Sequence, residues 1–86
     1  MLRNLNGHGI GRHIHEPPSI PNVWDPRNLD MLTEGMVITV EPFLAIGADR
    51  AVGGPDGWAL NTEDGGLAAQ FEHTLVVTGG APIILT

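Results

Sequence analysis

The pattern of apolar and polar residues predicts strands more clearly than helices. The strongest strand candidate is Met36–Leu44 (MVITVEPFL), which is rich in β-branched residues. On a two-residue period one of its faces is wholly apolar, formed by Ile38, Val40 and Leu44. The other face is mixed and carries Glu41, and the adjacent Pro42 lacks the N–H group that a strand ladder needs. We therefore expect a strand edge or a bulge at Pro42.

A second stretch, Ala68–Thr78 (AAQFEHTLVVT), repeats this arrangement. One of its faces is apolar apart from a histidine, and is formed by Phe71, His73, Leu75 and Val77. The opposite face is polar in the middle of the strand, where it carries Gln70, Glu72 and Thr74. Each of the two best strands therefore holds one glutamate between apolar neighbours.

Shorter segments complete the predicted sheet. Strands are expected at Trp58–Thr62 and at Pro82–Leu85. Asp64-Gly65-Gly66 predicts a hairpin turn between the segments WALNT and LAAQF, and Gly79-Gly80 predicts another before PIILT. These turns favour antiparallel pairing.

Helices have little room in this chain, because 7 prolines and 12 glycines interrupt it. The best helical candidate, Leu29–Thr33, is so short before Gly35 that we expect a turn there. The Pro-rich stretch from Glu16 to Gly35 is expected to be a loop crossing the surface. The predicted fold is thus mostly antiparallel β-structure with long loops and little or no helix.

Length and composition narrow the class of protein. A chain of 86 residues allows one small domain, whose stability is marginal without a metal, an oligomer or a partner segment. The absence of cysteine excludes disulfides and thiolate metal sites and fits a cytoplasmic location. A net charge of −6 argues against a nucleic-acid surface. No apolar run reaches the roughly 20 residues of a membrane span.

Three of the four histidines lie in one segment, GHGIGRHIHE. A histidine from this segment, His8 or a neighbour, could join Glu41 and Glu72 as metal ligands, since each lies on a different predicted strand. One imidazole with two carboxylates suits divalent Mn, Fe, Co or Zn, and metal-assisted hydrolysis is the corresponding chemistry. A glutamate between apolar neighbours in a strand is also costly unless it is paired or coordinated.

A simpler interpretation remains open on spacing alone. A glutamate in the middle of a strand usually lies on a solvent face, and His13 and His73 fit a surface or a satisfied core position better than a ligand role. Trp58 alone fits a packing residue. The glycines of GHGIG resemble a phosphate loop but lack the Lys-Ser/Thr ending and the following helix, so that interpretation is rejected.

Longer motifs carry a resemblance to a known family. GHGIGRHIHEPPSIPN, LTEGMVITVEPF, DGWALNTEDGGLAAQFEHTLVVT and the final ILT together resemble the C-terminal half of type I methionine aminopeptidases. Proline-specific peptidases and creatinase share the histidine and two glutamate positions, whereas the DGW and AAQFEHT stretches favour the methionine enzymes. The resemblance implies a pita-bread α+β parent fold, with residues 1–86 as the C-terminal half of its catalytic domain.

The resemblance also implies roles for individual residues. His8, Glu41 and Glu72 correspond to metal ligands, with Glu72 bridging two divalent ions, which could be Co, Mn, Fe or Zn. His15 corresponds to a catalytic residue that contacts the substrate backbone and stabilises the transition state, and Ile14 and Trp58 to the walls of a methionine pocket. The family often has an aromatic residue in place of Ile14. The implied reaction is release of the N-terminal methionine of nascent polypeptides.

The resemblance is incomplete. The family has two more aspartate ligands and a further histidine in its N-terminal half, and this chain has no counterpart to them; its aspartates fall in predicted loops, at Asp25, Asp30, Asp49, Asp56 and Asp64. We therefore expect the missing half to lie upstream of Met1. The chain alone is expected to lack useful activity and to bind metal weakly or not at all.

Two further expectations follow if the chain is the C-terminal half of a catalytic domain on its own. It would expose an apolar strand-rich face, so that a homodimer or a strand swap is expected. A competing class is a truncated, non-catalytic product or an interaction module of the same fold. Metal titration separates the two classes, because an interaction module does not need His8, Glu41 and Glu72 to bind an ion.

Overall fold

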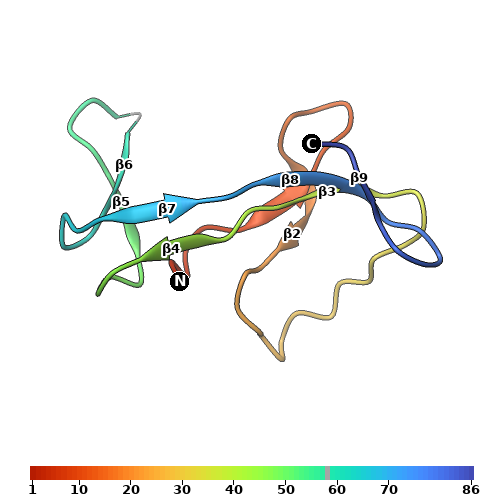
Figure 1. Ribbon diagram of the computed structural model, residues 1–86, viewed down its shortest axis with the longest axis horizontal. Helices are drawn as coiled ribbons and strands as arrows, with labels where there is room; N and C mark the ends of the chain where they lie inside the picture. The colour runs from red at the N-terminus through yellow and green to blue at the C-terminus, as the bar shows by residue number, and fades with distance from the viewer. Residues whose placement is uncertain (58) are drawn as a thin grey trace.

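The computed structural model describes residues 1–57 and 59–86, and within them the chain forms short strands joined by long loops (Figure 1). The strands are β1 (Gly7–Gly9), β2 (Glu16–Ile20), β3 (Val37–Val40), β4 (Phe43–Ala45), β5 (Ala51–Gly53), β6 (Leu60–Thr62), β7 (Ala68–Gln70), β8 (His73–Val76) and β9 (Ile83–Ile84). The described residues contain no helix, and hence none long and apolar enough to cross a membrane. The prediction of mostly antiparallel β-structure with long loops is confirmed.

Five of the strands form one antiparallel sheet in the order β2-β1-β3-β8-β9. Its second strand, β1, fits only because it contains glycine. A Cβ atom on Gly7 would lie 2.1 Å from the carbonyl oxygen of Thr39 on β3, and one on Gly9 would lie 2.2 Å from that of Pro17 on β2. The glycines of the GHGIG motif thus allow β1 to lie close to both neighbours, and this places His8 beside β3.

The two longest predicted strands are each broken in the middle. Val40 pairs with His73 and Phe43 pairs with Gln70, so the ladder stops at residues 41–42 and 71–72 and resumes beyond them. Pro42 has no N–H to donate, and its carbonyl accepts a 3.3 Å bond from the amide of Phe71 across the gap. The expected interruption at Pro42 is therefore found, but Met36–Leu44 and Ala68–Thr78 are not single strands.

Other details of the predicted pairing need correction. The predicted loop Glu16–Gly35 begins with a strand, β2, which tolerates Pro17 and Pro18 because it lies at the edge of the sheet. Asp64-Gly65-Gly66 forms a turn but no hairpin, since β6 pairs with β5 and β7 pairs with β4. The hairpin predicted at Gly79-Gly80 is confirmed by the pairing of β8 with β9.

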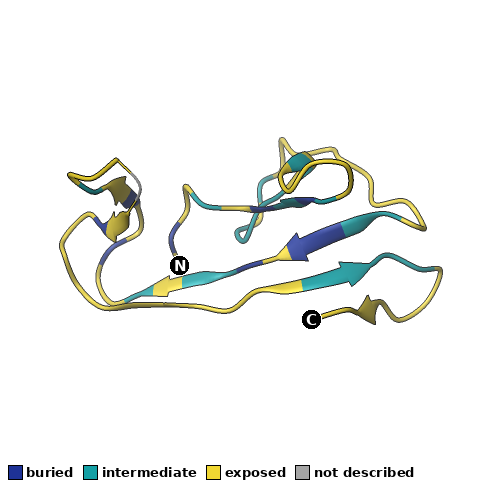
Figure 2. Cartoon of the chain, turned by 90° about the horizontal axis from the view of Figure 1, so that it is seen from above, coloured by how far each residue is buried: buried dark blue, intermediate teal, exposed yellow. Residues whose placement is uncertain are grey.

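Burial also differs from the predicted pattern. Thr39 and Glu41, on the mixed face of the first segment, are 1% and 8% exposed, whereas Leu44 on its apolar face is 53% exposed. Ile38 is buried in the five-stranded sheet, and a second small cluster consists of Leu2, Ala48 and Ala51. Figure 2 shows how few segments are buried and how much of the chain lies at the surface. Of the apolar face predicted for Met36–Leu44, Ile38 is therefore buried, whereas Val40 and Leu44 are exposed.

Candidate metal centre

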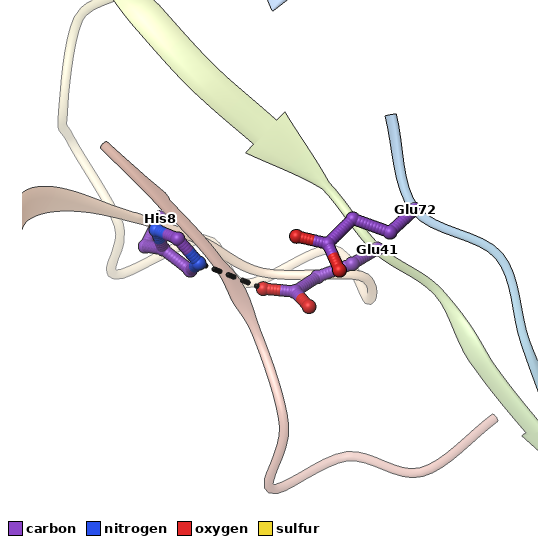
Figure 3. Close-up of side chains that lie close together, drawn as sticks. All are labelled: His8, Glu41 and Glu72. Atoms are coloured by element: carbon purple, nitrogen blue, oxygen red, sulfur yellow. Dashed lines mark ion pairs between the residues drawn. The ribbon is translucent and has the colours of Figure 1, made fainter. Parts of the chain in front are cut away.

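The break in the strand ladder is where three potential ligands meet. His8 comes from β1, Glu41 directly follows the residue that ends β3, and Glu72 directly precedes the start of β8. One ligand atom of each residue lies within 4.8 Å of the corresponding atoms of the others. Figure 3 shows the imidazole and both carboxylates turned toward one another. The structure therefore brings together the three residues that the sequence singled out, from strands far apart in the chain.

The orientation of His8 favours a cation at this place. Its Nδ1 lies 2.8 Å from the carbonyl oxygen of Gly9, and a carbonyl only accepts, so Nδ1 carries the hydrogen. A neutral ring then presents the lone pair of Nε2, which lies 3.2 Å from Oε1 of Glu41 (Figure 3). Two acceptors this close repel each other unless a proton or a metal ion lies between them. A backbone carbonyl on the far nitrogen is also the usual arrangement of a metal-binding histidine.

The carboxylate of Glu41 is buried and is held by two neutral donors. The hydroxyl of Thr39 donates to Oε1 at 3.3 Å, and the side-chain amide of Gln70 donates to Oε2 at 3.3 Å. The same amide nitrogen lies 3.4 Å from Oε2 of Glu72. Because an amide nitrogen carries two hydrogens, Gln70 can offer one to each carboxylate and lessen their mutual repulsion. The two acids are thus kept close without a cationic side chain between them.

Thr39 and Gln70 were not singled out from the sequence. Each stands two residues before one of the glutamates, and in a strand this spacing puts both side chains on one face. A polar residue at that position before each glutamate is the signal that could have identified them. Both donors help to satisfy a carboxylate near the site, which burial alone would make costly.

His15 lies beside His8. The two ring centroids are 4.3 Å apart, and the ring planes are tilted by 60°. His15 directly precedes β2, which pairs with β1, and the ladder shifts register between His8 and Gly9. The loop that carries His15 is closed by Glu16, whose carboxylate accepts the amide hydrogen of His13 at 3.3 Å. The pairing of β1 with β2 thus overcomes the seven-residue separation of the two histidines.

Ile14 is exposed in the structure, and the histidines other than His8 are not among the three grouped ligands. Ile14 is 70% exposed, next to His15 in the same loop. His13 is exposed and lies outside the group of ligands, as does His73, whose Nδ1 lies 2.6 Å from the carbonyl oxygen of Thr86. Trp58, predicted to line a methionine pocket, lies outside the described residues.

The donor set fits a divalent ion. One imidazole nitrogen and two carboxylates are ligands that Mn, Fe, Co and Zn accept, and the converging atoms come from three backbone segments. Three protein ligands do not fill the coordination shell of one such ion. They fill a still smaller part of the shells of two ions. Further ligands, water or protein, would have to complete it.

Comparisons with known proteins agree with this geometry. The family model described as metallopeptidase family M24 matches residues 1–79. The methionine aminopeptidase of Aquifex aeolicus is 49% identical over 87 aligned positions, which cover 99% of this chain and 34% of that protein. Methionine aminopeptidase 2 of Bacillus subtilis is 45% identical, with 100% of this chain and 35% of that protein covered.

Solved structures show the same likeness in three dimensions. The methionine aminopeptidase of Thermotoga maritima superposes with a TM-score of 0.89 and 42% identity, covering 99% of this chain and 34% of that one. That of Rickettsia prowazekii superposes with a TM-score of 0.85 and 43% identity, covering 96% of this chain and 34% of that one. The predicted resemblance to methionine aminopeptidases and their pita-bread fold is confirmed.

The chain spans about a third of the length of the curated relatives it matches. Within that third, the match runs through all three residues of the candidate centre and through His15. The chain belongs to metallopeptidase family M24.

Proposed function

We propose that this chain supplies one side of the metal centre of a cytoplasmic aminopeptidase that releases the N-terminal methionine of nascent polypeptides. The observation that carries the proposal is the convergence of His8, Glu41 and Glu72 at the broken ladder. The relatives that match nearly the whole chain at 41–49% identity are named methionine aminopeptidases, which supports this substrate class. Residues 1–86 would form the C-terminal half of the catalytic domain.

The three ligand residues would hold divalent ions, for which Co, Mn, Fe and Zn are the candidates. Glu41 would bind one ion and Glu72 would lie between two, consistent with their positions on facing segments. A bound ion would lower the pKa of its water and polarise the scissile carbonyl. His8, fixed by the Gly9 carbonyl, would keep Nε2 directed into the site throughout.

His15 would contact the backbone of the peptide substrate and stabilise the transition state. Its ring is exposed and close to that of His8, so a peptide held at the centre would lie within reach of its ring nitrogens. Such a donor is most effective when it is already in place before charge develops on the carbonyl oxygen. Ile14 and Trp58 would line the pocket for the methionine side chain.

The 86 residues on their own should bind a divalent ion weakly and turn over little or no substrate. Three ligands leave most of a two-ion shell to be supplied from elsewhere. Large apolar side chains beside β4 and β7 are also open to solvent, with Ile46 and Leu67 75% and 79% exposed. We propose that a second copy, through dimerisation or strand exchange, covers this face in the isolated chain.

A chimera tests the proposed activity directly. The 86 residues would replace the matching third of the Aquifex aeolicus protein, and hydrolysis of a Met-Ala peptide would be followed with added Mn²⁺ or Co²⁺. We expect turnover by the chimera, and a loss of at least about a hundredfold when His8 or Glu72 is changed to alanine. His13→Ala is the matched control, because His13 is exposed and lies outside the centre.

Two results would count against the proposal. A folded chimera without turnover would show that these residues do not serve an aminopeptidase site. Full turnover by the chimera carrying Glu72→Ala would show that the carboxylate is not a ligand. The alternative of an interaction module is favoured by the exposed apolar residues near β4 and β7, and predicts that neither substitution alters any binding property of the chain.

A further inference from the structure

Thr39 is among the most deeply buried side chains of the described residues, and its hydroxyl lies between two of the ligand residues. The side chain is 1% exposed. Its Oγ1 accepts the backbone N–H of His8 at 3.0 Å and donates to Oε1 of Glu41 at 3.3 Å. One hydroxyl thus connects β1, which carries the imidazole, with the end of β3, which carries the carboxylate.

The geometry leaves the hydroxyl little freedom. A threonine hydroxyl has a single hydrogen, and since the N–H of His8 occupies one of its lone pairs, that hydrogen is free to point at Glu41. The backbone of Thr39 is fixed as well, because it pairs with Thr74 on β8 and touches Gly7 on β1. The position of the hydroxyl is therefore set by three strands at once.

A side chain that merely filled this space would not need to be polar. Valine has almost the same shape and avoids the cost of burying a hydroxyl. Both hydrogen bonds of the Thr39 hydroxyl lead instead to residues of the candidate centre, and Oε1 of Glu41, which it contacts, is the atom 3.2 Å from Nε2 of His8. The hydroxyl is placed to control the spacing of these two ligand atoms.

We propose that Thr39 is a positioning residue, which holds the His8 backbone and the Glu41 carboxylate at the spacing that a divalent ion requires. This inference rests on the proposed function, because it assumes that His8 and Glu41 are ligands. Thr39 itself does not touch the ion. Its contribution is to reduce the rearrangement that the two ligands undergo when the ion binds.

The test compares Thr39→Val and Thr39→Ser in the 86-residue chain, with Mn²⁺ as the probe. Affinity is measured from the paramagnetic broadening of the His8 ring signals, which detects weak binding. We expect Thr39→Val to weaken Mn²⁺ binding about tenfold and Thr39→Ser to restore most of it, as for other residues that support a ligand. Thr74→Val is the matched control, since Thr74 pairs with Thr39 and, among the described residues, its side chain has no hydrogen bond to His8, Glu41 or Glu72.

A second measurement reports the hydrogen bond without any metal. Exchange of the His8 amide hydrogen with solvent should accelerate in Thr39→Val and stay slow in Thr39→Ser, because only the hydroxyl accepts that amide. Loss of the dispersed amide spectrum in Thr39→Val would show that this variant does not fold. In that case Thr39→Ser is compared with Thr39→Ala, because these two variants differ only by the hydroxyl. Amide spectra thereby separate loss of the fold from loss of positioning.

The outcomes are distinct. Equal Mn²⁺ affinity in wild type and a folded Thr39→Val would overturn the inference while leaving the metal centre intact. Equal weakening by valine and serine would assign the effect to packing and would also overturn it. If the wild-type chain does not bind Mn²⁺, the same variants are compared in the Aquifex aeolicus chimera, and absence of Mn²⁺ binding there as well would refute the centre itself, and the role of Thr39 with it.

Discussion

The β3–β8 and β4–β7 pairs are built from the same two segments of the chain, yet the first buries polar residues and the second leaves large apolar residues exposed. On the sheet side of the break, Thr39 and Glu41 are 1% and 8% exposed. Just beyond it, Leu44 is 53% exposed, and Leu67 beside β7 is 79% exposed. On the polar side, hydrogen bonds from Thr39 and Gln70 satisfy the buried carboxylate of Glu41, whereas on the apolar side large side chains are exposed. Polar residues can therefore be satisfied locally while the neighbouring apolar residues stay open to solvent.

The exposed apolar residues of β4 and β7 line a pocket. A shallow pocket of about 260 Å³ is lined only by apolar residues of the β4 and β7 segments, namely Leu44, Ala45, Ile46, Leu67, Ala68 and Ala69. Such a surface is open to a partner and not suited to a small polar substrate. The candidate metal ligands lie at the break in the ladder, and the exposed apolar residues lie beyond it.

The largest expected effect comes from the tight packing on the sheet side. Gly7→Ala should lower the free energy of unfolding by about 3 kcal/mol or more, because its Cβ would meet the Thr39 carbonyl oxygen at 2.1 Å. Gly53→Ala on β5 is the matched control, since nothing lies within 4 Å of its added Cβ. Urea unfolding measures both. Equal midpoints would show that β1 does not pack against β3 as described.

The second-largest expected effect is on association of the chain through the exposed apolar residues beside β4 and β7. The wild-type chain should associate as its concentration rises, and Leu67→Ser should weaken that association about tenfold, because a leucine buried in an interface contributes roughly 1.5–3 kcal/mol. Leu29→Ser is the control: Leu29 is similarly exposed, at 84%, but lies in the loop between β2 and β3. Light scattering measures the mass. A compact monomer at every concentration would show that the exposed apolar residues beside β4 and β7 do not drive association.

The smallest expected effect is at Asp25, whose carboxylate is partly exposed, in contrast with the buried Glu41. Arg27 holds the pKa of the Asp25 carboxyl below its usual value, first through its backbone N–H and then through its side chain. Arg27→Ala should therefore raise this pKa only part of the way, because the backbone N–H remains. A carbon-detected NMR titration of Asp25 measures it. No rise at all would show that the guanidinium does not hold the carboxylate.

The sign of the effect on stability follows from the lowered pKa. The Asp25–Arg27 pair contributes to folding above the ordinary pKa of an aspartate, and this contribution is lost as the pH falls through the lower, folded value. Because Asp25 and Arg27 lie in an exposed loop, solvent screens the pair and the contribution should be small. Urea midpoints of wild type and Arg27→Ala at pH 7 should therefore agree closely.

Much of the site was predictable from residue types and motifs. Glu41 and Glu72 stood out as acids between apolar neighbours, and Pro42 indicated an interruption beside one of them. The motif resemblance identifies His8 as the ligand, where the local pattern indicates only His8 or a neighbour. The structure brings these residues together because both strand segments break at the same level.

The remainder could not be predicted, for reasons that lie in long-range pairing. The sequence predicts a loop where β2 lies, because Pro17 and Pro18 weaken a strand signal. The place of β2 at the edge of the sheet is what makes both prolines acceptable. Thr39 and Gln70 are ordinary strand residues until the facing segment is known. Burial was wrong for Leu44 because a two-residue period separates two faces but does not say which of them is covered.

The central claim is that His8, Glu41 and Glu72 form one metal site, and a calorimetric titration with Co²⁺ tests it most directly. The wild-type chain and the control His13→Ala should bind Co²⁺ weakly and equally, with heat that saturates at one class of site. Glu41→Gln, which keeps the shape of the side chain and its contact with Thr39, should abolish the binding. Equal binding of Co²⁺ by Glu41→Gln and wild type would contradict the account.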